Sequence, residues 1–254
     1  MIGLYFSGTG NTRFCTEYFL GSVNPSATAY SIEDSKAIEG IANNDEIIFG
    51  YPVYYSNLPK IVSDFIISNS DLWNGKKIFV IATMALFSGD GAGVAARLFE
   101  KYGAEITGGL HLEMPDCIGD VRILKRTYEK NRAIVEKAKK KITISAQKYK
   151  LEQPTREGLH LGYRMAGFLG QRLYFINKTK SYTDKLKINL EDCIGCGKCA
   201  NVCPMNNIDV ISRKAVPKNL CTMCYRCVNV CPQKAITLIG SKVIEQHKIE
   251  KYLT

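Results

Sequence analysis

Eight of the ten cysteines in this 254-residue chain lie between residues 193 and 231. They form two copies of one pattern, CIGCGKCANVCP at 193–204 and CTMCYRCVNVCP at 221–232. In a C-x2-C-x2-C-x3-C-P run, the first three thiolates can wrap around one corner of a cubane, while the fourth reaches a second cubane. The spacing therefore predicts two [4Fe-4S] sites that exchange their fourth ligands.

The pattern assigns four cysteines to each predicted site. One set is Cys193, Cys196, Cys199 and Cys231, and the other is Cys221, Cys224, Cys227 and Cys203. Structural zinc is the alternative, but zinc sites use two C-x2-C pairs, often together with histidine. No histidine lies near either copy in the sequence, so the pattern favours iron–sulfur clusters.

A second stretch suited to chemistry stands near the N-terminus, where residues 5–13 read YFSGTGNTR. It follows an apolar run and opens onto a helix-like stretch. Hydroxyls and backbone N–H groups at a helix N-terminus suit a phosphate monoester. The lysine of an ATP-binding loop is missing, and Arg13 stands where a dinucleotide fingerprint has its third glycine. We therefore expect a phosphate site, with an ordinary N-cap loop as the alternative.

Alternating patterns over residues 1–150 predict the scaffold that holds this loop. Short apolar strands alternate with helical segments, and the fourth strand is almost wholly apolar, as a strand buried on both faces is. The expected strands are 2–6, 27–31, 45–50, 77–82 and one within 104–113, with helices at 13–21, 58–66, 92–102 and 121–148. This alternation predicts a doubly wound parallel sheet.

The loops after the first, third and fourth strands are expected to share one pocket. Ligands of such sheets bind at the carboxyl ends of the strands, where the strand order reverses. In the order 2-1-3-4-5 these strands are neighbours, so loops 7–12, 50–59 and 83–93 meet there.

Charge and hydropathy bear on two classes of function, nucleic-acid binding and membrane insertion. The formal charge is +10, of which residues 1–150 carry +2 and residues 151–254 carry +8. Two clusters and a phosphate would bring the net charge to about +4, so the excess of basic residues is weak support for nucleic-acid binding.

No apolar run approaches the length of a membrane span, and we expect a cytoplasmic protein without stable membrane insertion. The basic, aromatic stretch 160–178 is expected to pack between domains, with a membrane-surface or partner-docking helix as the alternative.

The motifs resemble known families. SGTGNT resembles the phosphate loop of flavodoxins, and the doubled cysteine pattern is that of bacterial ferredoxins. Together they resemble the EFR1-type flavodoxin–ferredoxin fusion proteins of anaerobes over nearly the full length. The resemblance implies an α/β, flavodoxin-like doubly wound five-stranded parallel sheet, a linker, a small α+β dicluster ferredoxin domain and a C-terminal tail. The expected boundaries are 1–150, 151–189, 190–240 and 241–254.

The resemblance also implies FMN and two [4Fe-4S] clusters in one chain, and it indicates which loops hold the flavin. The phosphate would lie on Ser7, Gly8, Thr9, Gly10, Asn11 and Thr12. One side of the isoalloxazine would be flanked by Pro52, Val53, Tyr54, Tyr55 and Asn57, with Tyr54 or Tyr55 lying on the ring. The other side would be closed by Thr83, Phe87, Ser88, Gly89, Asp90 and Gly91, with Phe87 a competing stacking aromatic and residues 88–91 offering backbone groups.

Several residues leave alternatives open. Glu33 or Asp34 lies about twenty residues beyond the loop and could bind a ribose, which keeps NAD as a rival cofactor. Cys15 and Cys117 are expected to be small buried hydrophobes, because neither has a histidine partner. The three histidines, His111, His160 and His247, show no ligand spacing.

We expect an electron-transfer protein that delivers low-potential electrons to a redox partner protein. No general acid or base stands out in the flavin loops, so no catalytic residue is assigned. Two alternatives remain: a flavin-dependent reductase of a quinone or other small molecule, and an iron–sulfur redox sensor.

Overall fold

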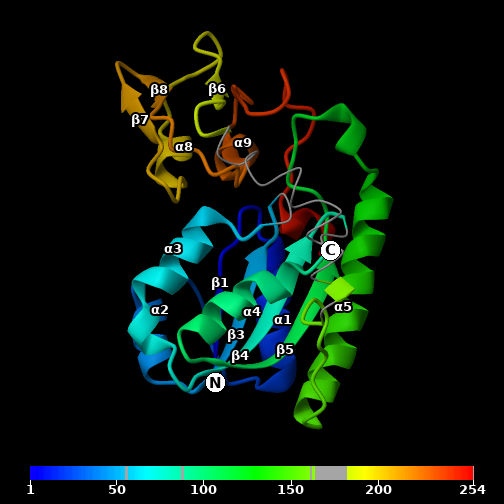
Figure 1. Cartoon of the computed structure of the whole chain (residues 1–254). Helices are drawn as coiled ribbons and strands as arrows, with labels where there is room; N and C mark the ends of the chain where they lie inside the picture. The colour runs from blue at the N-terminus through cyan, green and yellow to red at the C-terminus, as the bar shows by residue number, and fades with distance from the viewer. Residues whose placement is uncertain (55–56, 87–88, 161, 164–181, 254) are drawn as a thin grey trace.

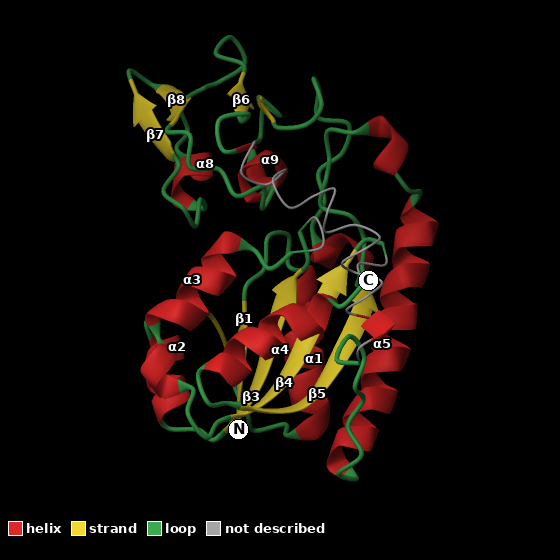
Figure 2. Cartoon of the chain, in the orientation of Figure 1, coloured by secondary structure: helices red, strands yellow, loops and turns green. Residues whose placement is uncertain are grey.

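A computed structural model describes residues 1–54, 57–86, 89–160, 162–163 and 182–253 of the chain. Figures 1 and 2 show a layered α/β body and, above the carboxyl ends of its strands, a smaller body of short strands and helices. None of the helices in the described ranges has the length and apolar character that crossing a membrane requires.

The α/β body is built on a five-stranded parallel sheet. Its order is β2-β1-β3-β4-β5, which confirms the predicted order. The strands are β1 (Ile2–Tyr5), β2 (Ala29–Ser31), β3 (Glu46–Pro52), β4 (Lys77–Met84) and β5 (Glu105–Glu113). The order of strands therefore reverses between β1 and β3. The loops that follow these two strands lie at the carboxyl edge of the sheet.

Helices cover both faces of the sheet. They are α1 (Asn11–Val23), α2 (Lys36–Ala42), α3 (Lys60–Ser68), α4 (Gly91–Lys101) and α5 (Tyr128–Lys150), with short turns at η1 (Ser70–Leu72) and η2 (Arg122–Leu124). Because side chains alternate along a strand, Val80 packs towards α2, α3 and α4, while Phe79 and Ile81 pack towards α1 and α5. Cys15 is fully buried in that second core, as expected of a small hydrophobe.

Two helices differ from the sequence-based expectation. The helix expected at 121–148 begins only at Tyr128, because the Thr127 hydroxyl accepts from the Lys130 N–H and caps the helix there. Helix α2 was not predicted, since its seven residues are too short for a clear 3.6-residue period. Most of the stretch 160–178 lies outside the described residues.

The smaller body keeps the internal repeat of its sequence. The hairpin β7 (Ile208–Ile211) and β8 (Lys214–Pro217) and the pair β6 (Lys187–Ile188) and β9 (Ile236–Thr237) are antiparallel. Helices α8 (Lys198–Asn201) and α9 (Arg226–Val230) begin at the same position of the two cysteine patterns. Its buried side chains gather around the cysteines.

The end of the chain returns to the α/β body (Figure 1). Residues Ile249–Tyr252 form the short turn η5, and both named side chains are 1% exposed in the core shared by α1 and α5. The Ile249 N–H donates to the Thr9 carbonyl over 3.0 Å. The expected tail at 241–254 therefore packs on the predicted phosphate loop.

Candidate functional site

The predicted phosphate loop joins β1 to α1. Its turn is set by Gly10 in the left-handed region (φ 93°), where the Gly10 N–H donates to the Ser7 hydroxyl over 3.1 Å. The Thr12 hydroxyl bonds the Thr83 hydroxyl at 2.7 Å, which ties the loop to the end of β4. Among the described residues no side chain caps α1, so its first N–H groups face the loop as a phosphate would require.

A cleft opens beside this loop at the carboxyl edge of the sheet. Residues of four sheet loops line it, and so do two residues of the smaller body. The lining is Ser7, Gly8, Thr9, Asn11, Thr12, Pro52, Val53, Tyr54, Thr83, Met84, Ala85, Leu86, Met114, Pro115, Asp116, Cys117, Ile118, Met223 and Tyr225. The hydroxyls of Ser7, Thr9, Thr12 and Thr83 belong to the phosphate loop and the β4 end next to it, and apart from Asp116 most of the remaining lining is apolar. This lining fits a phosphate beside the loop and a flat aromatic ring beyond it.

The predicted ring-contacting residues divide into three groups. Pro52, Val53, Tyr54 and Thr83 line the cleft, and Asn57 holds Tyr54 through reciprocal backbone hydrogen bonds of 3.1 and 3.0 Å. Gly89, Asp90 and Gly91 are buried at the start of α4, outside the cleft lining, and the Asp90 carboxylate pairs with Arg97. Their contact with the ring therefore stays a prediction. Tyr55, Phe87 and Ser88 lie outside the described residues.

The segment Met114–Ile118 was missed by the sequence analysis, although five consecutive residues of it line the cleft. The Asn11 amide donates to the Pro115 carbonyl over 2.7 Å and joins this segment to the phosphate loop. This segment follows β5 and therefore lies at the same edge of the sheet as the three predicted loops. Its position after a predicted strand could have indicated that it lines the cleft. Cys117 is half-buried in this wall and packs against the core of the smaller body.

The two predicted cysteine sets each surround one cavity. The outer site is defined here by Cys193, Cys196, Cys199 and Cys231, which line a cavity with residues of β6, β8 and β9. The inner site is defined by Cys203, Cys221, Cys224 and Cys227, which line a second cavity closed by apolar side chains such as Val228. Both arrangements fit the ligand exchange that the spacing predicts.

The surroundings of the sulfur atoms fit cubane ligation. Backbone N–H groups of Ala215, Asn207 and Met223 donate to the sulfurs of Cys193, Cys203 and Cys221 over 3.3–3.4 Å, as anionic sulfur requires. Burial raises the pKa of the Cys224 thiol to about 12, so it becomes a thiolate only where a metal offsets the desolvation.

A single-ion site is a different geometry from a cubane. In the ranges that the structure describes, no three His, Cys, Asp or Glu side chains converge on one ion position. A cubane does not need such convergence, because each thiolate bonds a different iron at a separate corner of the cluster.

The two cysteine patterns make the same turns with different residues. In the outer pattern, Gly195 (φ 69°) and Gly197 (φ 73°) adopt the left-handed region that glycine tolerates. In the inner pattern, the equivalent residues are Met223 (φ 62°) and Tyr225 (φ 58°), which adopt it under strain. These two residues are the ones that line the cleft.

The inner site lies directly against the phosphate loop. A Cβ placed on Gly8 would come within 2.5 Å of the Cys224 carbonyl oxygen and 3.2 Å of the Tyr54 hydroxyl. Only glycine therefore allows the inner cysteine pattern to approach the loop this closely.

One buried carboxylate joins the smaller body to the end of the cleft wall. Asp120 is 4% exposed, and its carboxylate accepts from the Tyr225 hydroxyl at 3.1 Å. It also accepts from three consecutive backbone N–H groups at 238–240, at 2.7 to 3.1 Å. Such a nest of N–H groups is a strong anion site, so Asp120 fixes both the inner cysteine pattern and the segment after β9 to the α/β body.

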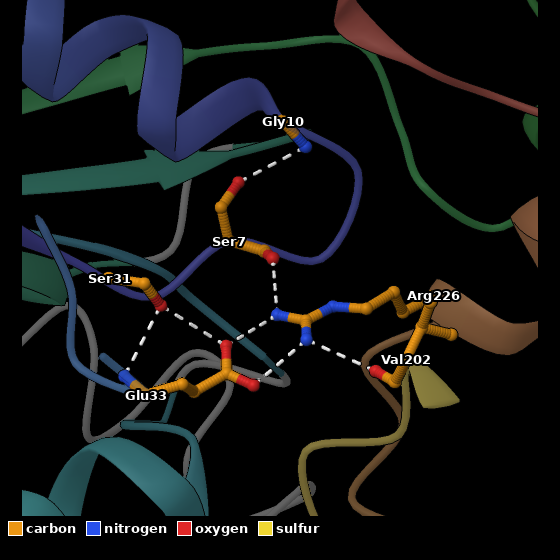
Figure 3. A network of polar contacts seen from close by, with 6 residues as sticks. All are labelled: Ser7, Gly10, Ser31, Glu33, Val202 and Arg226. Carbon is orange, nitrogen blue, oxygen red and sulfur yellow. Dashed lines mark hydrogen bonds and ion pairs between the residues drawn. The ribbon is translucent and has the colours of Figure 1, made fainter. Parts of the chain in front are cut away.

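A second polar contact joins Arg226 of the inner pattern to the α/β body (Figure 3). Its guanidinium pairs with both Glu33 carboxylate oxygens at 2.9 and 2.7 Å, and it donates to the Ser7 carbonyl over 2.8 Å. Glu33 is thus engaged by Arg226, and the Asp34 carboxylate accepts from the Lys36 N–H. The two carboxylates considered for a nicotinamide cofactor have protein partners instead.

His111 serves the architecture rather than the cleft. Its ring Nε2 accepts from the Ala92 N–H at 3.0 Å and caps α4. Burial lowers the pKa of His111 to about 4, which keeps the ring neutral and able to accept. His247 bonds the Tyr252 hydroxyl, and burial likewise lowers its pKa. Neither ring lines the cleft.

Family models match both bodies. Residues 2–106 match the flavodoxin domain, and residues 185–238 match the 4Fe-4S dicluster domain. No curated protein matches the chain.

Solved structures resemble part of the chain. Two-electron reduced Megasphaera elsdenii flavodoxin is 21% identical, and the match covers 58% of this chain and 99% of that one, with a TM-score of 0.43. Oxidised flavodoxin 2 from Bacillus cereus is 19% identical over 57% and 94% of the two chains, with a TM-score of 0.43. Rubredoxin oxygen:oxidoreductase from Desulfovibrio gigas is 14% identical over 59% and 36%, with a TM-score of 0.39.

Proposed function

Because this chain joins a flavodoxin domain to a 4Fe-4S dicluster domain, we propose that it passes electrons between two [4Fe-4S] clusters and FMN and delivers low-potential electrons to a partner protein. A flavodoxin domain implies FMN, and a dicluster domain implies two [4Fe-4S] clusters, which makes the chain an iron–sulfur flavoprotein electron carrier. When bound, the clusters supply one-electron chemistry, and FMN accepts one or two electrons.

The chain's own residues would hold these groups as follows. The hydroxyls of Ser7, Thr9 and Thr12 and the N–H groups at the start of α1 would bind the FMN phosphate. Tyr54 and Met114 would flank the ring within the cleft. The inner and outer cysteine sets would each provide four thiolates to one cluster.

A single observation carries this proposal: the inner cysteine pattern is itself part of the cleft wall. Met223 and Tyr225 flank Cys224 in sequence and line the same cleft as the phosphate loop. Electron exchange requires short separations and little reorganisation, and Asp120 and Arg226 hold the two bodies in this position.

The outer site supports exchange with a partner. Cys196 is exposed, and Ile194 beside it is 55% exposed, whereas Cys224 and Cys227 of the inner site are buried. A partner protein docking on the outer site would reach Cys196, whereas each of the four inner cysteines is buried or half-buried.

The decisive experiment is cofactor stoichiometry in protein purified without oxygen. We expect about eight iron atoms and one FMN per chain. Eight irons without FMN uptake would contradict the proposal, because the cleft would then serve another phosphate ligand. Steady-state turnover with quinones and other small acceptors tests the reductase alternative, and rapid turnover would favour it over a carrier.

A further inference from the structure

Two residues of the inner cysteine pattern stand out when the two patterns are compared position by position. Gly195 and Gly197 of the outer pattern correspond to Met223 and Tyr225 of the inner pattern. All four adopt a left-handed backbone, with φ between 58° and 73°. The turn thus needs this conformation in both patterns, yet only the outer one uses the residue that adopts it without strain.

The surroundings of Gly195 show why the outer pattern keeps glycine there. A Cβ on Gly195 would lie 2.2 Å from the Arg213 carbonyl oxygen, whereas a Cβ on Gly197 would meet no atom within 4 Å among the described residues. At the second position, therefore, packing alone does not decide between glycine and a side chain. Tyr225 in the inner pattern needs another explanation.

The side chains of the inner pattern lie against the cleft. Met223 is 2% exposed and Tyr225 is 3% exposed, and both line the cleft that also contains the phosphate loop. The Tyr225 hydroxyl is held by the Asp120 carboxylate, which fixes the direction of the ring. Strained residues that persist in a fold are commonly found at functional sites.

We propose that Met223 and Tyr225 are FMN-contacting residues, by which the 4Fe-4S dicluster domain supplies one wall of the flavin site. A thioether and an aromatic ring suit this position, because both pack favourably against a flat aromatic ligand. This inference rests on the proposed function, since it requires FMN in the cleft.

The repeat itself provides the test variants. Met223→Gly and Tyr225→Gly place in the inner pattern the residue that the outer pattern already uses, so the backbone strain is relieved. The Met223 N–H that donates to the Cys221 sulfur is retained in Met223→Gly. We expect both variants to keep their iron and to unfold at a somewhat lower temperature, because each loses a buried side chain. We expect the FMN dissociation constant to rise about tenfold.

A matched control comes from the same domain. Lys234 has a left-handed backbone (φ 52°) and an exposed side chain outside the cleft lining. Lys234→Gly relieves similar strain, and we expect it to leave FMN affinity unchanged. Tyr225→Phe keeps the ring and removes the bond to Asp120, so we expect nearly wild-type FMN affinity.

The readouts are iron content, flavin fluorescence titration and the visible absorption band of bound FMN. Unchanged FMN affinity and spectrum in both glycine variants would overturn the inference. An equal loss in Tyr225→Phe and Tyr225→Gly would overturn it for Tyr225, because docking through Asp120 would then explain the effect.

Two further outcomes remain decisive. If a glycine variant loses iron, Met223→Leu and Tyr225→Leu replace it, and an unchanged flavin spectrum in both overturns the inference. Wild-type chain that holds iron but takes up no FMN would refute the proposed function itself. Normal uptake by wild type and variants alike would refute only this inference.

Discussion

The two bodies of this chain are stabilised in different ways. The α/β body buries large aromatic side chains completely, among them Phe19, Phe49, Trp73, Phe79 and Phe99. The smaller body has strands of only two to four residues and leaves Ile194, Val210, Ile211, Val216 and Leu220 exposed. A segment of this size buries too little apolar surface to fold alone, whereas a doubly wound sheet buries enough.

This difference indicates that the two bodies depend on different interactions for their stability. The α/β body forms most of the cleft from its own loops, whereas we expect the smaller body to depend on bonds between its cysteines and iron. Docking through Asp120 and Arg226 then joins a stable part to a metal-dependent one.

The largest expected effect follows from removing iron. Metal binding contributes on the order of 10 kcal/mol to the folding of small metal domains. We therefore expect chelation of iron to unfold residues 185–238 while the α/β body stays folded. Hydrogen exchange measured by region reports the first part, and fluorescence of Trp73, the single tryptophan, reports the second. If β7, β8 and α9 stayed protected from hydrogen exchange without iron, the smaller body would not depend on iron for its folding.

A smaller effect is expected from pH, and it concerns the α/β body alone. His111 is neutral in the folded chain. Its pKa is lowered from 6.5 to about 4, chiefly by burial and also by Lys141, while the carboxylates of Glu157 and Asp90 oppose the shift. Above pH 6.5 the ring is neutral in both states, so the stability is complete. As the pH falls through this window, the unfolded state takes the proton first, and up to about 3 kcal/mol is lost by pH 4.

Urea unfolding followed by Trp73 fluorescence at pH 7 and near pH 4 measures this loss. His111→Gln keeps an acceptor that does not titrate, and we expect it to flatten the pH dependence. His160, whose side chain is exposed, provides the control, since His160→Gln should leave the slope as it is. An equal slope in His111→Gln and wild type would show that another group is responsible.

The smallest effect tests the contact between the bodies. In Gly8→Ala the new methyl would meet the Cys224 carbonyl, and we expect docking to weaken by about 1–3 kcal/mol, as overpacking does. Gly21→Ala is the matched substitution, because Gly21 lies in α1 with no described atom within 4 Å of a new Cβ. It should stabilise α1 by about 1 kcal/mol.

Thermal unfolding of the iron-loaded chain compares the two glycine variants, and hydrogen exchange at residues 223–231 locates the change. Equal protection of that segment in Gly8→Ala and Gly21→Ala would mean that the close approach at Gly8 does not hold the bodies together.

Much of this molecule follows from local patterns. The almost wholly apolar run at 77–82 and the alternation of strands with helices predicted the parallel sheet, because hydrophobic periodicity is a local property. The predicted strand order was that of the flavodoxin-like fold that the resemblance implies. The cysteine spacing predicted two sets of four, and each set surrounds one cavity in the structure. The loops after the first, third and fourth strands were predicted to meet, and residues of all three line one cleft.

Other features depend on contacts between residues far apart in the chain. Asp120 meets Tyr225 across 105 residues, and Arg226 meets Glu33 across 193. Nothing in the local sequence of Asp120 indicates a nest of N–H groups at 238–240. The return of Ile249 to the phosphate loop likewise depends on where the smaller body places the end of the chain.

The sequence by itself predicted the parallel sheet and grouped the cysteines into two sets of four, because residue type and short spacing suffice for these predictions. Only the tertiary structure decided that Met223 and Tyr225 line the cleft. Their glycine counterparts in the outer pattern were visible in the sequence, but the strain became apparent only from the backbone angles. The two strained residues lie beside the phosphate loop because the smaller body docks on the α/β body.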